Sequence, residues 1–375
     1  MRFARLLPEN DGEFRKDARF MIPEQPELPE LPELPELIEK LLRAEPADPK
    51  ALEEALHRIM MGEVTAPLTA GLLVALRVRE PDARTLAACA RAMRAHRIAV
   101  TTEVRPLVDT CGTGGDRTGT FNISTAAALV VAAAGGAVAK HGNRSVSSQA
   151  GSADVLEAAG AVLSLGPREA ARCLDATGFS FLFAPVFHPA MANVAPVRKA
   201  LGIRTLFNLL GPLANPALAQ RQLLGVYDPS MTRVMAEALV ALGCEGALVV
   251  HCEGLDEIGL HGITQGHFVN DGTVSTFTLD PRDLRLARAP LESLKGGDAA
   301  TNAAILKAVL EGEEGPKADV VALNAAAALG VAGLTRDLAE GLDVAREVLK
   351  NGGASRVLAR YVETTQRLAA EEGRS

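Results

Sequence analysis

The stretch DTCGTGGDRTGTFNIST, residues 109–125, gathers four glycines, two aspartates and several hydroxyl side chains in one place. It follows a short apolar run and precedes the long apolar run 126–134. In a turn between a strand and a helix, backbone N–H groups point toward an anion. Arg117 stands where the dinucleotide-binding GxGxxG pattern needs glycine, and no Lys-Ser/Thr pair follows Gly119 as in a Walker A loop. The pattern favours a phosphate-binding loop over a plain turn.

A second polar run, KHGNRSVSS, occupies residues 140–148. Its two cations, one amide and three hydroxyls could clamp an anion and also recognise a polar substrate. A solvated turn accepts the same residue types, so the composition alone leaves both interpretations open.

Asp256 and Glu257 stand side by side just after the apolar stretch ALVVHC. Paired carboxylates at the end of a strand suit Mg²⁺, which takes few protein oxygens and adds substrate phosphates, although adjacent acids are also common on surfaces. His141 is the better acid–base candidate on the ordinary pKa of histidine, whereas His188 is interpreted as a packed or capping residue. No Ser-His-Asp arrangement is apparent.

Short apolar stretches alternate with helical patterns after residue 105, which predicts an α/β fold with a mostly parallel sheet and helices on both faces. The stretches predicted as strands are RPLVDTCG (105–112), GAVAKHG (136–142), QRQLLGVYD (220–228) and GALVVHCEG (246–254). The runs predicted as helices between them are 152–162, 167–178 and 229–243. Loops at the carboxyl ends of such strands are where ligands usually bind.

The part of the chain before this region is helical in pattern. Four runs between residues 38 and 101 space their apolar residues three and four apart, and Asp48 and Thr65 are predicted helix starts. The segment 187–217 fits neither a strand nor one helix, and we expect it to fold back onto the helical unit and cover the strand ends. The repeat PEQPELPELPELPEL, residues 23–37, predicts an extended segment because proline at every third position blocks helix and sheet pairing. A solvated tail is the favoured interpretation, and a docking arm is the alternative.

Composition restricts the class of protein. The 375 residues are 48% hydrophobic and 23% charged with a net charge of −7, which argues against a nucleic-acid partner. Five scattered cysteines without a CxxC pair indicate a reducing cytoplasm rather than a disulfide or zinc framework. The charged N-terminus has no signal-peptide pattern, and the most apolar window, 124–139, is too short to span a membrane and is interpreted as a buried core helix.

Several motifs taken in order resemble the anthranilate phosphoribosyltransferase family. They are GTGGD, NIST, KHGNRSVSS, GSADVLEAAG, HPAMANVAPVRKALGIRTLFNLLGPLANP and LDEI. The resemblance runs from about Leu37 to about Val362, which is nearly everything except the Pro-Glu-Leu tail.

This resemblance implies a small helical domain beside a large α/β domain, with the active site in the cleft at their hinge and a homodimer formed through the helical domain. The corresponding boundaries are a disordered extension 1–36, a helical domain 37–105 with a return segment at about 188–215, and an α/β domain 106–187 and 216–375. The implied reaction joins anthranilate to phosphoribosyl pyrophosphate with release of pyrophosphate, in tryptophan biosynthesis.

The resemblance also implies the site residues. Those implied for phosphoribosyl pyrophosphate are Gly112, Gly114, Gly115, Asp116, Thr120, Asn122, Ser124, Thr125, Lys140, His141, Gly142, Asn143, Arg144, Ser145, Val146, Ser147, Ser148 and Ser152. Those implied for anthranilate are Gly112, Asn143 and Arg198, with Arg198 on the carboxylate. Ser124, Asp256 and Glu257 would bind Mg²⁺.

Two other functions share parts of the pattern. A pyrimidine nucleoside phosphorylase has the same two-domain plan but differs in the glycine loop and the basic motif. A nucleic-acid-binding paralogue without transferase activity should show a basic stripe and altered anthranilate residues. Because the amine of anthranilate is a neutral nucleophile, we expect positioning to matter more than a strong base, with no single residue essential as general base.

Overall fold

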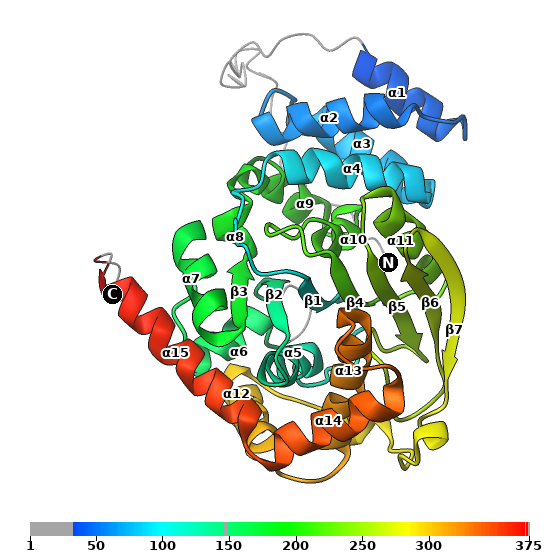
Figure 1. Ribbon diagram of the computed structural model, residues 1–375. Coiled ribbons are helices and arrows are strands. Elements are labelled where there is room, and N and C mark those ends of the chain that lie inside the picture. Colours follow the sequence, from blue (N-terminus) through cyan, green and yellow to red (C-terminus); the bar gives the residue numbers. More distant parts are fainter. Residues whose placement is uncertain (1–32, 146–148, 372, 374–375) are drawn as a thin grey trace, which may run out of the picture. The chain divides into compact units, whose positions relative to one another are not determined.

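The computed structural model describes residues 33–145, 149–371 and 373 (Figure 1). The predicted extension lies outside these residues except for its last four. Those four begin the first helix, α1 (Glu33–Leu42), so residues 33–36 are helical rather than disordered. Acidic side chains in the first turn of α1 and Lys40 in its last turn complement the helix dipole.

Four helices form the N-terminal helical unit, as the spacing of apolar residues predicted. After α1 these are α2 (Pro49–Met61), α3 (Ala66–Val78) and α4 (Ala83–Ala95). Asp48 caps α2 by accepting a 3.0 Å hydrogen bond from the backbone N–H of Lys50. Thr65 is the N-cap of α3, although its side chain makes no capping hydrogen bond. Both predicted helix starts are confirmed.

A seven-stranded sheet forms the centre of the α/β part (Figure 1). The spatial order is β3-β2-β1-β4-β5-β6-β7, with the first five strands parallel and the last two antiparallel. The strands are β1 (Leu107–Gly112), β2 (Ala137–Gly142), β3 (Phe179–Phe183), β4 (Arg221–Gly225), β5 (Gly246–Cys252), β6 (Thr264–Asn270) and β7 (Thr273–Leu279). The four predicted strands are confirmed, whereas β3, β6 and β7 were not predicted.

Helices cover both faces of this sheet, which confirms the predicted fold class (Figure 1). In β5, Leu248 and Val250 point to one apolar core, and Ala247 and Val249 point to the other. The helices that contribute to the first core are α5 (Ile123–Ala133), α6 (Ser152–Ala158), α7 (Pro167–Thr177), α12 (Ala299–Leu310), α13 (Pro316–Ala332), α14 (Leu338–Lys350) and α15 (Gly353–Glu371). The second core combines α11 (Met231–Ala241) with α1 to α4.

The segment after β3 folds back onto the helical unit, as expected. It contains α8 (Ala184–Phe187), η1 (Pro189–Asn193), α9 (Ala195–Leu201), α10 (Phe207–Leu210) and η2 (Gly211–Leu213). Many of its apolar side chains, including Val197 and Leu210, belong to the core of the helical unit. Phe187 and Ala217, at its two ends, belong to a smaller cluster on the sheet. Its far end covers the sheet, because Asn215 Nδ2 donates 2.8 Å hydrogen bonds to Ala139 O in β2 and to Asp109 Oδ2 in β1.

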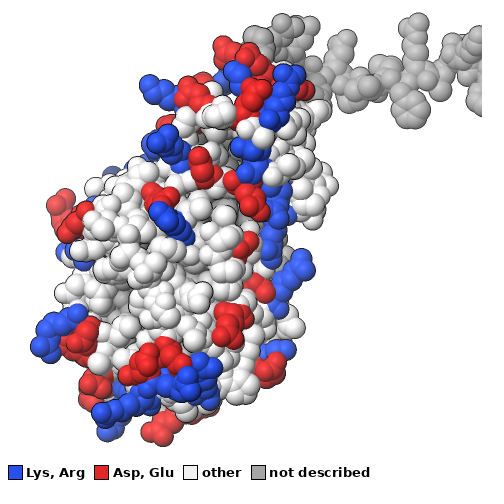
Figure 2. Space-filling model, turned by 90° about the vertical axis from the view of Figure 1, so that its right-hand side faces the viewer, with Lys and Arg blue, Asp and Glu red and all other residues white. Residues whose placement is uncertain are grey.

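Charged side chains of both signs share the surface (Figure 2), and the cysteines are free. On the face in Figure 2, Lys and Arg lie beside Asp and Glu, and a broad area carries neither. The five cysteines are free, and all except Cys244 are buried. Among the described residues, no helix is both long enough and apolar enough to cross a membrane.

The short 3-10 helices η3 (Pro281–Leu284) and η4 (Leu291–Leu294) connect β7 to α12.

Candidate active site

The carboxyl ends of β1, β4 and β5 lie side by side at one edge of the sheet, and glycines in β1 and β4 allow the loop after β5 to approach them. The register places Gly112 beside Gly225, and Gly225 beside Val250. A Cβ atom on Gly112 would lie 2.4 Å from Asp256 Oδ2, and one on Gly225 would lie 1.5 Å from Asp256 O. Only glycine fits at either position, because such distances are far below van der Waals contact.

The glycine-rich loop that follows β1 (the glycine loop) is hydrogen-bonded to the loop after β5 that contains Asp256 and Glu257 (the acidic loop). The backbone N–H of Gly114 donates a 2.7 Å hydrogen bond to Asp256 Oδ2. Gly114 and Gly115 have φ angles of 68° and 80°, which favour glycine because a side chain would be strained there. The two loops that the sequence predicted for phosphate and for metal are thus in direct contact.

Asp256 and Glu257 stand side by side where these loops meet, and the charge of Asp116 acts on both. Burial raises the pKa of Asp256 well above its usual range, and the negative charges of Asp116 and Glu257 add to this effect. Burial also raises the pKa of Glu257 to about 7, although Lys140 and hydrogen bonds from Ser124 act in the opposite direction. A bound cation would relieve this repulsion, so the donor set fits a divalent metal ion.

Lys140 lies beneath this cluster rather than on the surface. It is 2% exposed, and its Nζ donates hydrogen bonds to Thr110 O and, at 3.1 Å, to Ser124 Oγ. The backbone N–H of Ser124 in turn donates to Glu257 Oε1 at 3.1 Å. Lys140, Ser124 and Glu257 therefore form one hydrogen-bonded set that connects β2, α5 and the acidic loop.

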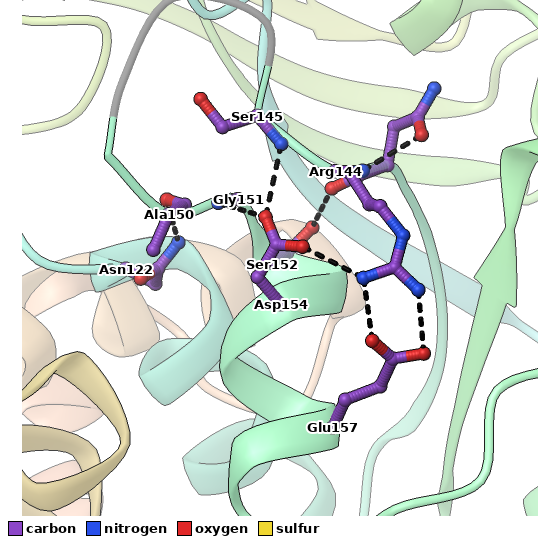
Figure 3. A network of polar contacts seen from close by, with 9 residues as sticks. Asn122, Arg144, Ser145, Ala150, Gly151, Ser152, Asp154 and Glu157 are labelled. Carbon is purple, nitrogen blue, oxygen red and sulfur yellow. Dashed lines mark hydrogen bonds and ion pairs between the residues drawn. The ribbon is translucent and has the colours of Figure 1, made fainter. Parts of the chain in front are cut away.

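The second predicted loop is held by α6, as Figure 3 shows. Arg144 donates to both oxygens of Glu157 and, at 2.8 Å, to Asp154 Oδ1. Asp154 Oδ2 also accepts from the backbone N–H groups of Ser145, at 3.2 Å, and Gly151, at 2.8 Å. The Arg144 guanidinium, expected to contact phosphates, is thus neutralised by two carboxylates.

The other predicted residues of this region fall into three groups. Ser152 donates to Asn143 O at 3.3 Å, and Gly142 ends β2 beside it. Thr120 forms an antiparallel bridge with Lys295, and the buried Thr125 hydroxyl has no partner among the described residues. Val146, Ser147 and Ser148 lie outside the described residues.

His141 does not have the ordinary imidazole pKa that made it an acid–base candidate. Burial and the neighbouring His188, whose ring centroid is 5.1 Å away, lower the pKa of His141 to about 3. Its Nδ1 lies 3.0 Å from Gly211 O, so Nδ1 carries the proton because a carbonyl oxygen only accepts. The interpretation of His188 as a packed residue is confirmed, since it is 1% exposed and bonds Ala214 O at 2.9 Å.

Two arginines of the return segment lie near aromatic rings. Arg198 is on α9, and its guanidinium is 5.3 Å from the ring centroid of Phe207. Burial lowers its pKa, and no carboxylate pairs with it within the described residues. Arg204 lies 4.1 Å over the ring of Tyr227 and donates a hydrogen bond to Gly115 O of the glycine loop.

The sequence interpretation missed several residues that hold these loops. Arg204 lies inside a quoted motif but was given no role there. Asp154 is a capping residue three positions after Gly151, a spacing that could have revealed it. Asn302 and Lys295 come from a distant segment, and no local pattern relates them to the glycine loop.

Comparisons with known proteins agree with this architecture. The model of the glycosyl transferase family a/b domain matches residues 104–355, and that of the family's helical bundle domain matches residues 35–97. An anthranilate phosphoribosyltransferase from Symbiobacterium thermophilum is 51% identical over 321 residues, covering 85% of this chain and 94% of that protein. The corresponding protein from Rubrobacter xylanophilus is 49% identical over 332 residues, covering 88% of this chain and 97% of that protein.

Solved structures give the same result. The anthranilate phosphoribosyltransferase of Thermus thermophilus matches with a TM-score of 0.83 and 49% identity, over 88% of this chain and 99% of that one. The Saccharomyces cerevisiae enzyme in complex with PRPP and Mg matches with a TM-score of 0.82 and 28% identity, over 89% of this chain and 98% of that one. Fold and site together define a glycosyltransferase built from a helical bundle and an α/β domain. Within that class, the chain belongs to the anthranilate phosphoribosyltransferase family.

Proposed function

We propose that this chain transfers the phosphoribosyl group of phosphoribosyl pyrophosphate to the amine of anthranilate and releases pyrophosphate. The observation that supports this most directly is the contact between the glycine loop and the acidic loop at Gly114 and Asp256. It places the glycine-rich loop, a type of loop that suits phosphate, next to carboxylates, which suit a cation that bridges phosphates.

Mg²⁺ fits the residues at this edge of the sheet. Ser124, Asp256 and Glu257 would hold the ion. Within the described residues, no cluster of three His, Cys, Asp or Glu side chains forms a metal site made by the protein alone. A magnesium ion that shares its coordination with substrate oxygens needs no such cluster. When bound, the ion would neutralise negative charge on the pyrophosphate leaving group.

The loops supply the remaining contacts to phosphoribosyl pyrophosphate. Gly112, Gly114 and Gly115 would line the phosphates, with the side chains of Thr120 and Asn122 beside them. The N–H groups of Gly114 and Ser124 donate to Asp256 and Glu257, so the N–H of Gly115 is the better candidate for a direct phosphate contact. Asn143, Arg144, Ser145 and Ser152 would flank the sugar. Arg144 already pairs with Asp154 and Glu157. The role of Arg144 in this site is therefore to stabilise the loop rather than to neutralise a phosphate.

Anthranilate would bind through its carboxylate to Arg198, with Asn143 and Gly112 beside the ring. A planar guanidinium meets a carboxylate through two parallel hydrogen bonds. The amine is neutral and needs no base to become a nucleophile, so the protein's contribution is to position it against the sugar carbon as pyrophosphate leaves.

The chain would act as a homodimer through its helical unit. Exposed apolar side chains occur near the ends of α1, α2 and α3, at Leu42, Met61 and Val78. Sedimentation equilibrium of the wild type and of Val78→Asp tests this, because a charge buried in an apolar interface should shift the protein to monomer. A location in the cytoplasm remains a prediction.

The proposed reaction is tested by following anthranilate fluorescence after the protein is mixed with phosphoribosyl pyrophosphate, with and without Mg²⁺. We expect loss of anthranilate only when the metal ion is present. No loss with the folded protein and both substrates would overturn the proposal, and phosphorolysis of thymidine or uridine would then identify the nucleoside phosphorylase alternative.

A further inference from the structure

Asn302 lies outside every motif that marks the site, yet its side chain reaches one of the site's residues. It is on the first turn of α12 and is 2% exposed. Its Oδ1 accepts a 2.8 Å hydrogen bond from the backbone N–H of Gly297, and its Nδ2 donates at 3.1 Å to Asn122 Oδ1. A buried amide with both ends bonded has a fixed orientation.

The segment before α12 is fastened to the end of the glycine loop. The backbone N–H of Phe121 donates to Leu294 O and that of Gly296 donates to Gly119 O, both at 3.0 Å. A Cβ atom on Gly296 would lie 2.3 Å from Asn302 Oδ1. The segment 294–297 therefore holds Asn302 against Asn122, although 180 residues separate the two in the sequence.

Asn122 uses its side chain differently from most residues at a helix start. It is the N-cap of α5, but its amide makes no capping hydrogen bond. Instead, Oδ1 accepts from Asn302, and Nδ2 donates to Ala150 O at 3.4 Å, as Figure 3 shows for the latter bond. The donor end of the Asn122 amide therefore faces the second substrate loop.

The orientation of the Asn122 amide follows from the chain of hydrogen bonds that starts at Gly297. Gly297 N–H can only donate, so it selects the oxygen of Asn302; the nitrogen of Asn302 then selects the oxygen of Asn122. Phosphate oxygens of an ionised diphosphate accept hydrogen bonds and donate none, so Asn122 can assist only with its nitrogen outward.

We propose that Asn302 is a positioning residue that keeps Asn122 oriented as a hydrogen-bond donor toward phosphoribosyl pyrophosphate. This inference rests on the proposed function. The substrate contact is made by Asn122, and Asn302 acts only through it.

Asn302→Asp tests the orientation with almost no change in shape. An aspartate still accepts from Gly297 N–H, but its second oxygen needs a donor, so the Asn122 amide turns and presents its oxygen to the substrate. We expect the KM for phosphoribosyl pyrophosphate to rise by about tenfold or more, as for a lost hydrogen bond to a charged group. The KM for anthranilate and the kcat should change much less.

Ala300→Asp is the matched control for charge, since Ala300 is exposed on the same turn of α12. A double-mutant cycle with Asn122→Ala then separates positioning from general damage. In the Asn122→Ala background, Asn302→Asp should raise the KM for phosphoribosyl pyrophosphate no more than Ala300→Asp does. The proposal would be overturned if Asn302→Asp raised this KM as much in the Asn122→Ala background as in the wild type. It would also be overturned if Asn302→Asp alone had no more effect than Ala300→Asp.

Asn302→Ala in the same cycle gives a second measurement should Asn302→Asp not fold. It removes the anchor of Asn122 without adding charge, and coupling to Asn122→Ala is again the expected result. Absence of any wild-type activity would contradict the proposed function, whereas an active wild type with uncoupled variants would contradict the role of Asn302 alone.

Discussion

At the scale of single residues, Arg198 offers the sharpest test of substrate recognition. A lysine keeps the charge but cannot form two parallel hydrogen bonds to a carboxylate. We expect Arg198→Lys to raise the KM for anthranilate by about 10- to 100-fold and to leave the KM for phosphoribosyl pyrophosphate nearly unchanged. Lys199→Arg, on the same helix and exposed, is the control in steady-state kinetics. Equal effects of Arg198→Lys on both constants would contradict the assignment.

His141 tests whether the reaction needs a general base. With a pKa of about 3, its imidazole is a poor proton acceptor. Loss of a general base typically costs about 10²- to 10⁴-fold in rate, so we expect His141→Ala to lower kcat by less than about tenfold. Steady-state kinetics with both substrates saturating measures kcat, and single-turnover kinetics shows whether the chemical step changes with it. A larger loss with unchanged substrate affinities would assign His141 a role in proton transfer.

At the scale of elements, the approach of β4 to the acidic loop is the most constrained contact in the site. Gly225→Ala must push Asp256 O away, because the new Cβ would lie 1.5 Å from it. We expect a loss of about 1–3 kcal/mol in the free energy of unfolding. The activity should also need more Mg²⁺ for half saturation.

Gly330→Ala on α13 is the matched control for this change. The nearest side-chain atom to its new methyl group is Thr335 Oγ1 at 4.0 Å, and the position is helical. We expect it to be neutral or to stabilise the fold by up to about 1 kcal/mol. If urea denaturation gave the same loss for both variants, the close contact at Gly225 would not be the cause.

The elements also show which parts of the fold could be predicted from sequence. The four predicted strands are apolar runs bounded by turn residues, and each is present. β3 was missed because the short run FSFLF directly follows α7. β6 and β7 were missed because polar residues interrupt them, although Asp271 and Gly272, with φ of 44° and 78°, form a turn that marks a hairpin.

The contacts within the site were beyond the reach of the sequence for a different reason. Each loop could be recognised from its own residues, but the bond from Gly114 to Asp256 depends on the order of the strands. The same holds for Asn302, which reaches Asn122 only through the ribbon at residues 294–297. Long-range polar contacts have no periodicity, so local patterns cannot reveal them.

At the scale of the whole molecule, buried histidines make stability depend on pH. Burial lowers the pKa of His188 to about 4 from an ordinary value of 6.5. Below pH 6.5 the imidazole of His188 is protonated in the unfolded chain but stays neutral in the folded chain. The stability that depends on neutral His188 is therefore fully present above pH 6.5 and is lost as the pH falls toward 4. At pH 4.5 the loss should be roughly 2–3 kcal/mol from this residue.

Urea denaturation of the wild type and of His188→Gln at pH 7 and pH 4.5 measures this dependence. Glutamine can donate to Ala214 O but does not titrate in this range. The variant should lose less stability between the two pH values than the wild type. An identical loss in both proteins would assign the acid sensitivity to other groups.

One core is shared by the helical unit, the return segment and one face of the sheet. Leu72 of α3, Leu210 of α10 and Val249 of β5 all belong to it. The two family models divide the chain between residues 97 and 104, but no break in packing accompanies that division. Exchange of the bundle between relatives would therefore have to carry the return segment and the facing side of α11 with it. A recombinant that keeps this core intact would need a larger segment than the module visible in the sequence.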